Sequence, residues 1–214
     1  MTRPDFSFEK SNSGLCVGLD EAGCGPWAGP VMAGAVCFLS YEIESEPWVL
    51  DIHDSKKLSV KKRERLFSIL ISHPLVVYGV GIADVKEIDS LNIARASCLA
   101  MERAFQALSQ EKLAYTALSY ALVDGTRKPN LSVGYQSLIK GDSRSLSIAA
   151  ASIIAKVTRD THMQELAKSY PEYGWEKNAA YGTKAHIEAI EKHGITPHHR
   201  VSYKPIAKYA QSAA

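Results

Sequence analysis

A short apolar run over residues 15–19 leads directly into two adjacent carboxylates, Asp20 and Glu21, and the chain then breaks into glycines and prolines. This pattern predicts a buried strand that feeds a tight turn. Because side chains alternate across a regular strand, consecutive acids share one site only where the strand ends, so we expect it to end at about Asp20. Gly23 and Gly25 lack a Cβ, which lets the turn adopt positive φ and lets a polar ligand approach bare backbone groups.

Two acids at a strand end, beside such an open turn, favour a bound hard cation. Mg2+ and Mn2+ prefer carboxylate oxygens and water as ligands. The alternative is a surface turn whose carboxylates are only solvated, which is the commoner explanation of an isolated Asp-Glu pair. The cation hypothesis predicts that further acids converge on Asp20 and Glu21 from other parts of the chain.

Two later strands are also followed by acids. An apolar strand at 120–124 ends in Asp124 before a glycine, and a strand at 133–139 leads into Asp142. A lone Asp before Gly is ordinarily a turn residue, so Asp124 becomes a ligand candidate only in combination with the first pair. The resulting set of candidate metal ligands consists of Asp20, Glu21, Asp124 and Asp142.

The remaining periodic segments predict further strands and helices. We expect strands at 31–39 and 76–83 and helices at 60–70, 88–108, 147–160 and 184–192. A turn and an N-cap are expected at 54–59, before the first of these helices. Asp160 lies far along its helix, where pairing with Arg159 or another base is favoured over metal ligation.

Length and composition predict one domain over residues 1–214, with a C-terminal appendage from about residue 170. No apolar run approaches the roughly 18 residues of a membrane span, and the N-terminus lacks a signal core, so we expect no membrane partner and a cytoplasmic location. The cysteines form no CxxC pair, which indicates reduced thiols and argues against a zinc site. They are Cys16, Cys24, Cys37 and Cys98.

Charge is divided unevenly along the chain. Residues 1–124 carry 12 Lys and Arg against 16 Asp and Glu, a net charge of −4, whereas residues 125–214 carry 13 against 7, a net charge of +6. The basic second half favours a polyanionic partner, and a solvated basic face is an equally frequent alternative. His198 and His199 have no Cys or carboxylate at ligand spacing, which argues against a metal site there.

Taken in order, the motifs of this chain resemble those of the ribonuclease HII family from about Gly14 to Pro205. The motifs are GLDEAGCGPWAGPV at 18–31, DSKKLS at 54–59, EIDSLNIARA at 87–96, LVDG at 122–125, KGD at 140–142, SIAAASIIAKVTRD at 147–160, YGT at 181–183 and HHRVSYKP at 198–205. Each motif alone is weak, but the ordered set is highly specific.

The resemblance implies an RNase H-like α/β fold, a mixed β-sheet flanked by helices, with a helical C-terminal part over about residues 170–214. It implies that the catalytic ligands of Mg2+ or Mn2+ are Asp20, Glu21, Asp124 and Asp142. The implied activity is endonucleolytic hydrolysis of the RNA strand in RNA/DNA hybrids, and incision 5′ of ribonucleotides embedded in duplex DNA. A two-metal site would leave 5′-phosphate and 3′-hydroxyl ends.

The resemblance also implies substrate contacts. Gly23, Cys24 and Gly25 are expected to recognise the 2′-hydroxyl through their backbone, and Tyr181 to pack on the neighbouring deoxyribose. The family usually carries arginine at the position of Cys24, and backbone recognition does not depend on that side chain. Lys56 or Lys57 is a candidate point-charge contact for a nearby phosphate. The alternative explanation is that the two lysines are a solvated pair that precedes a helix. We expect a monomer that binds RNA/DNA hybrid and ribonucleotide-containing duplex DNA.

Two competing interpretations are the type III enzyme and a non-catalytic hybrid-binding module. The type III enzyme carries a separate N-terminal substrate-binding domain, for which the dozen or so residues before the first strand leave no room. Retention of the four acids argues against a module that has lost turnover.

Overall fold

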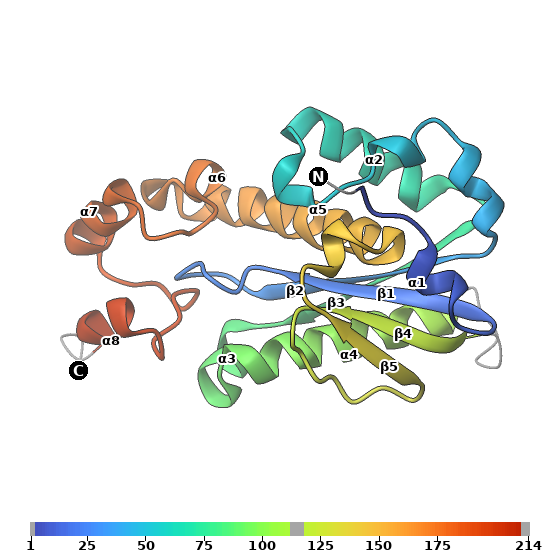
Figure 1. The fold of residues 1–214 in the computed structure, drawn as a ribbon. Helices are drawn as coiled ribbons and strands as arrows, with labels where there is room; N and C mark the ends of the chain where they lie inside the picture. The colour runs from blue at the N-terminus through green and yellow to red at the C-terminus, as the bar shows by residue number, and fades with distance from the viewer. Residues whose placement is uncertain (1–2, 112–117, 211–214) are drawn as a thin grey trace.

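The computed structural model describes residues 3–111 and 118–210 and contains one five-stranded mixed sheet with helices on both faces (Figure 1). The strands are β1 (Leu15–Ala22), β2 (Val31–Phe38), β3 (Val76–Ala83), β4 (Leu118–Asp124) and β5 (Gly134–Leu138). Their order across the sheet is β3-β2-β1-β4-β5. The predicted α/β class with a mixed sheet is confirmed.

The helices that cover and extend the sheet are α1 (Ser7–Lys10), α2 (Val60–Ser72), α3 (Val85–Leu91), α4 (Ile93–Glu111), α5 (Leu146–Ser169), α6 (Trp175–Asn178), α7 (Lys184–His193) and α8 (Lys204–Ala210). Short 3-10 helices are η1 (Tyr41–Ser45), η2 (Val49–Asp51), η3 (Ser55–Lys57), η4 (Gly141–Ser143) and η5 (Pro171–Tyr173). Among the described residues, none of these helices combines the length and apolarity that crossing a membrane requires.

The central strand β1 is paired differently along its two edges. Its antiparallel pairing with β2 continues to Ala22 opposite Met32, whereas its parallel pairing with β4 ends at Leu19 opposite Val123. The expectation that the strand ends at about Asp20 is therefore wrong, because β2 holds the strand in register past both acids. What ends near Asp20 is the contact with β4.

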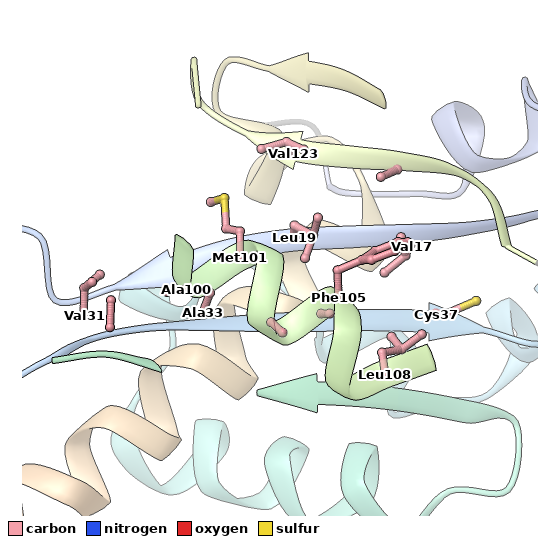
Figure 2. Packing of buried hydrophobic residues seen from close by; sticks show 14 of the residues in the cluster. Val17, Leu19, Val31, Ala33, Cys37, Ala100, Met101, Phe105, Leu108 and Val123 are labelled. Carbon is pink, nitrogen blue, oxygen red and sulfur yellow. The ribbon is translucent and has the colours of Figure 1, made fainter. Parts of the chain in front are cut away.

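The two faces of the sheet pack on different helices. Val17 and Leu19 face α4, where they meet Met101 and Phe105 in the largest apolar cluster (Figure 2). The opposite face lies directly against α5, since a Cβ on Gly18 would come within 2.2 Å of the α5 backbone. The glycines of β1 and β2 and the small residues of α5 thus allow the helix and the sheet to approach each other closely.

The helix predicted at 88–108 is two helices, α3 and α4, separated at Asn92. Asn92 has φ of 69°, and its side-chain oxygen accepts hydrogen bonds from the N–H groups of Ala94 at 3.0 Å and Arg95 at 3.2 Å. Asparagine tolerates positive φ and caps helix N-termini well. Local capping therefore interrupts an apolar face that is otherwise continuous.

The residues after α5 pack around a second, smaller apolar cluster. Trp175, Tyr173 and Ile190 lie at its centre, and Ala28 from the turn after β1 joins them. Figure 1 shows α6, α7 and α8 grouped at one end of α5, beyond the sheet. This places the C-terminal residues beside the glycine-rich turn that follows β1.

Candidate active site

Asp20 and Glu21 lie at the end of β1 that extends past β4. Asp20 is only 7% exposed, and its Oδ1 accepts a hydrogen bond from the N–H of Glu21 at 2.7 Å. The Oε1 of Glu21 lies 3.3 Å from Nε of Arg127 and also accepts from the thiol of Cys24 at 3.3 Å. The extended strand therefore presents one buried and one partly buried carboxylate beyond the point where its pairing with β4 stops.

Asp124 and Asp142 come from the adjacent strand end and from η4. Asp124 is the last residue of β4, and its Oδ1 accepts hydrogen bonds from the N–H groups of Gly141 at 2.7 Å and Asp142 at 3.4 Å. These two bonds fix η4 against the end of β4. Asp142 is thereby held next to Asp124.

Burial and mutual repulsion raise the pKa of three of the four acids. The pKa of Asp20 is raised first by burial and then by the charges of Glu21, Asp124 and Asp142. Burial is also the main cause that raises the pKa of Asp124, with Glu21 adding to it, and that of Asp142, with Asp54 and Asp124 adding to it. The structure thus brings the four predicted acids close enough to repel one another.

These residues fit a divalent cation by their chemistry. The Oε2 of Glu21 is buried and has no hydrogen-bond partner in residues 3–111 and 118–210. Clustered carboxylates in a poorly solvated site are stabilised by a cation, which removes both the repulsion and the unsatisfied oxygen. Within the described part of the chain, no three His, Cys, Asp or Glu side chains form a ready-made metal site, so the ligand assignment stays a prediction.

The structure separates the two candidate lysines. Burial alone would lower the pKa of Lys56, but the charges of Asp20 and its neighbouring acids outweigh burial and raise it. Both lysines are exposed, but Lys57 donates to the hydroxyl of Ser143 at 3.3 Å, and Lys56, unlike Lys57, lines the same cavity as Asp20 and Glu21. Lys56 is therefore the lysine that lies among the acids.

One cavity joins two of the predicted metal ligands to most of the predicted substrate residues, and its lining does not include Asp124, Asp142 or Lys57. Its lining includes Asp20, Glu21, the turn 23–25, Lys56 and Tyr181. Residues far apart in the sequence are therefore next to one another in space.

The glycines of the turn have different roles. Gly23 has φ of 102°, and a Cβ there would lie 2.2 Å from Nε of Arg159. Gly25 does not have positive φ, so the expectation of positive φ is right for Gly23 and wrong for Gly25. Gly25 provides space instead, since a Cβ there would lie 3.3 Å from the ring of Tyr181.

Two buried arginines hold the carbonyl groups of this turn. Arg200 donates to the carbonyls of Gly23 at 2.7 Å and Cys24 at 3.2 Å, and the hydroxyl of Tyr203 also donates to Cys24 at 2.6 Å. Arg159 donates in the same way to the carbonyl of Pro30 at 3.1 Å. This role of the two arginines was not predictable from the sequence, because they lie within family motifs but no local pattern around them indicates a contact with the turn.

Hydrogen bonds thus occupy the carbonyls of Gly23 and Cys24, whereas two N–H groups of the same turn are free in the part of the chain that the structure describes. Within the described residues, no hydrogen bond uses the N–H of Cys24 or Gly25. The Cys24 side chain points into the protein, with its sulfur 3.3 Å from the hydroxyl of Ser97. Any substrate contact of Cys24 is consequently left to its backbone.

The Tyr181 ring is 48% exposed, while its backbone is anchored from below. Its carbonyl accepts hydrogen bonds from Nδ1 of His186 at 3.0 Å and from the N–H of Thr183 at 2.8 Å. The Nε2 of His186 in turn lies 3.1 Å from both the indole nitrogen of Trp175 and Nε2 of His199. His199, from the motif at 198–205, therefore belongs to a buried hydrogen-bond network beneath Tyr181.

Asp160 is paired with a base, as expected, but not with Arg159. Its carboxylate accepts from Nζ of Lys156 at 2.6 Å and lies 3.8 Å from the guanidinium of Arg63. The second alternative left open by the sequence is therefore correct. Lys156 also lines the cavity of Asp20 and Glu21, although the sequence did not indicate it.

The family model for ribonuclease HII matches residues 17–206, which is nearly the whole chain. The chain belongs to the ribonuclease HII family. Ribonuclease HII of Magnetococcus marinus is 53% identical over 211 residues, which cover 95% of this chain and 93% of that protein. Ribonuclease HII of Wolbachia sp. subsp. Brugia malayi is 48% identical over 213 residues, covering 100% of this chain and 99% of that protein.

The fold agrees with this family. The crystal structure of ribonuclease H2 from Pyrococcus horikoshii OT3 superposes with a TM-score of 0.72 at 26% identity, covering 92% of this chain and 98% of that chain. The RNase H-like fold predicted from the motifs is confirmed. As a ribonuclease HII, the enzyme is a metal-dependent endoribonuclease that acts on RNA/DNA hybrids.

Proposed function

We propose that the enzyme holds two divalent cations, Mg2+ or Mn2+, on Asp20, Glu21, Asp124 and Asp142 and cleaves the RNA strand to leave 5′-phosphate and 3′-hydroxyl ends. The observation that carries this proposal is that the buried Asp20 and the partly buried Glu21, Asp124 and Asp142 gather at neighbouring strand ends, and that Oε2 of Glu21 has no hydrogen-bond partner among the described residues. When bound, such cations activate the attacking water and stabilise the leaving oxygen.

The other cavity residues would bind and orient the substrate. Lys56 offers a point charge to a backbone phosphate near the acids, where the neighbouring carboxylates outweigh the effect of burial and keep it charged. The N–H groups of Cys24 and Gly25 would donate to a 2′-hydroxyl, which both donates and accepts hydrogen bonds. The carbonyls of Gly23 and Cys24 belong to the same peptide groups as these amides and are already held by Arg200 and Tyr203, which fixes the direction in which the amides point.

We further propose that the enzyme incises 5′ of a ribonucleotide embedded in duplex DNA. Gly25 and the Tyr181 ring face each other across a short gap, so that a group reading the 2′-hydroxyl and a flat surface for the adjacent sugar lie side by side. Such a pair would recognise a junction between a ribonucleotide and a deoxyribonucleotide. A long RNA strand is not required for that contact.

A cleavage assay on three end-labelled duplexes tests these proposals. The duplexes contain one embedded ribonucleotide, a full RNA strand, or DNA only, and each is incubated with Mg2+, with Mn2+ or with EDTA. We expect incision 5′ of the single ribonucleotide, multiple cuts in the hybrid, none in the DNA duplex, and no cleavage in EDTA. Binding without cleavage would instead favour a non-catalytic hybrid-binding module, and metal-independent cleavage would contradict the assigned acids.

We propose that residues 170–214 work as an appendage of a single catalytic domain, because Arg200 and Tyr203 complete the turn after β1. A monomer in the cytoplasm is also proposed. The free thiols of the chain support a reducing compartment; they are Cys16, Cys24, Cys37 and Cys98.

A further inference from the structure

Glu9 is a buried acid that the proposed chemistry does not use. It lies in α1, before residue 17 where the match to the family model begins, and it is 0% exposed. Its Oε1 accepts hydrogen bonds from the hydroxyl of Ser145 at 2.6 Å and from the N–H and hydroxyl of Ser147 at 2.9 Å and 2.6 Å. A carboxylate at this place is favoured by the unpaired amides of the first turn of α5.

The neighbours of Glu9 hold the same part of the chain. The N–H of Asp5 donates to the carbonyl of Arg144 at 3.3 Å, and the carbonyl of Asp5 accepts from the N–H of Leu146 at 3.1 Å. The guanidinium of Arg144 lies 4.7 Å from the centre of the Phe8 ring. Residues 5–9, which we term the N-terminal strap, therefore grip residues 144–147 at several points.

The gripped segment directly follows η4, which carries Asp142. The N–H groups of Arg144 and Ser145 both donate to the carbonyl of Gly141, at 2.9 Å and 2.8 Å. The N–H of Gly141 in turn donates to Oδ1 of Asp124 at 2.7 Å. An unbroken series of hydrogen bonds therefore connects Glu9 through Ser145 and Gly141 to Asp124, and Asp142 lies within it.

We propose that Glu9 is a positioning residue of the active site, which fixes η4 so that the Asp142 carboxylate and the Gly141 amide stay in place beside Asp124. This inference rests on the proposed function of Asp124 and Asp142 as metal ligands. Residues that orient metal ligands without touching the metal commonly change metal affinity by about 10- to 100-fold when they are removed. Because Glu9 acts through Ser145 and Ser147, we expect its removal to change the metal affinity by a factor in this range.

The test compares Glu9→Ala and Glu9→Gln with a control, Glu44→Gln. Glu44 pairs with Lys10 next to the N-terminal strap, at 2.7 Å and in an exposed position. The first measurement is amide hydrogen exchange of the metal-free protein well below its melting temperature. We expect Glu9→Ala to lose protection from exchange at the amides of Gly141 and Asp142, while protection of the amides in β1–β3 stays as in the wild type. In the control variant, protection should be unchanged at all of these amides.

The second measurement is the Mg2+ concentration that gives half-maximal cleavage, with hybrid binding in EDTA measured alongside. We expect this concentration to rise about 10-fold or more in Glu9→Ala, with hybrid affinity unchanged. Glu9→Gln should show a smaller change, because its amide oxygen can still accept from Ser145 and Ser147. This conservative variant also carries the test if Glu9→Ala does not fold.

The outcomes separate the inference from the proposed function. Unchanged exchange at Gly141, or a lower melting temperature with unchanged Mg2+ dependence, would overturn the positioning role. If exchange at Gly141 increases as expected but Asp124→Asn and Asp142→Asn retain wild-type Mg2+ dependence, the proposed metal role fails while the connection of Glu9 to η4 stands.

Discussion

The guanidinium of Arg127 lies beside the carboxylate of Glu21, with Nε 3.3 Å from Oε1 and Nη2 3.7 Å from the sulfur of Cys24. Arg127 belongs to the loop between β4 and β5, so a residue 106 positions away supplies a cation to the end of β1. One oxygen of Glu21 is thereby paired, while the other, Oε2, is left without a partner.

Arg127→Gln should destabilise the metal-free enzyme and increase the stabilisation that Mg2+ provides. The two side chains are 26% and 14% exposed, so we place the loss between those of surface and buried ion pairs, at roughly 1–2 kcal/mol. Bound Mg2+ would replace the missing cation, so thermal unfolding with and without Mg2+ should show a larger Mg2+-induced shift in the variant.

The matched control for Arg127→Gln is Arg95→Gln. Arg95 pairs at 2.6 Å with Glu102, whose side chain is 11% exposed and lies on α4, outside the cavity of the acids. We expect it to lose stability without any change in the Mg2+-induced shift. Equal shifts in the two variants would show that Arg127 does not influence the metal site.

Asp20→Asn should abolish cleavage but stabilise the metal-free protein. Repulsion and burial raise the pKa of Asp20 above its unfolded value of about 3.9, so above that pH the native state binds more protons and stability falls as pH rises. The variant removes this loss, and Asp124→Asn should do so to a smaller extent because its carboxylate also accepts backbone hydrogen bonds.

The measurements for Asp20→Asn are urea unfolding at neutral pH without metal and cleavage in Mg2+. We expect cleavage to fall by more than about 100-fold, as when a group that stabilises transition-state charge is lost. Turnover close to wild type would exclude Asp20 as a ligand.

Gly25→Ala should impair substrate recognition with little cost in stability, whereas Gly23→Ala should destabilise the fold. The added methyl at Gly25 meets only the half-exposed Tyr181 ring, but at Gly23 it meets Arg159 at 2.2 Å and requires an alanine at φ of 102°. The backbone conformation alone costs roughly 1–3 kcal/mol. Urea unfolding and binding of ribonucleotide-containing and all-DNA duplexes would be compared.

Gly194→Ala is the control for backbone strain, since Gly194 has φ of 80° and nothing within 4 Å of the new methyl. Gly23→Ala should lose clearly more stability than this control. An unchanged preference for the ribonucleotide in Gly25→Ala would contradict recognition by this turn.

Tyr181→Ala should weaken cleavage of the embedded-ribonucleotide duplex strongly, and Tyr181→Phe only slightly. Packing on a sugar needs the ring more than the hydroxyl, and such stacking is worth roughly 1–3 kcal/mol. Values of kcat/KM for the two variants decide the matter. Equal losses would point to a role for the hydroxyl instead.

Stability should fall in mild acid because of His199. Burial lowers its pKa to about 4, so the native state binds fewer protons than the unfolded state between about pH 4 and 6.5, and stability is lost as pH falls through this window. At 1.36 kcal/mol per pKa unit the contribution is roughly 3 kcal/mol. In His199→Asn the slope of unfolding free energy against pH should flatten, while the exposed control His193→Asn should keep the wild-type slope.

Much of the fold was predictable because it depends on local patterns. The strand predicted at 76–83 coincides with β3, and the N-cap expected before α2 is formed by Ser59, whose hydroxyl accepts from the N–H of Lys62. The end of β1 was not predictable in this way. Alternation along one strand says nothing about where β2 and β4 stop pairing with it, and that difference is what places Asp20 and Glu21 beyond the last residue paired with β4.

The candidate site shows the same division. The four acids could be found because each follows an apolar strand, whereas Arg127 lies in a loop with no pattern around it. Glu9 likewise contacts Ser147 across 138 positions, a contact that only the folded chain creates. Separating Lys56 from Lys57 also required the structure, because adjacent lysines are equivalent in sequence.

The grip of Arg200 on Gly23, across 177 positions, has a consequence for how the enzyme is made. Chains begin to fold from the N-terminus while they are still being synthesised. All four acids leave the ribosome before the donor that completes the turn beside them. A nascent chain, or one terminated between Asp142 and Arg200, would therefore carry all four acids and still lack the residue that holds the carbonyls of Gly23 and Cys24.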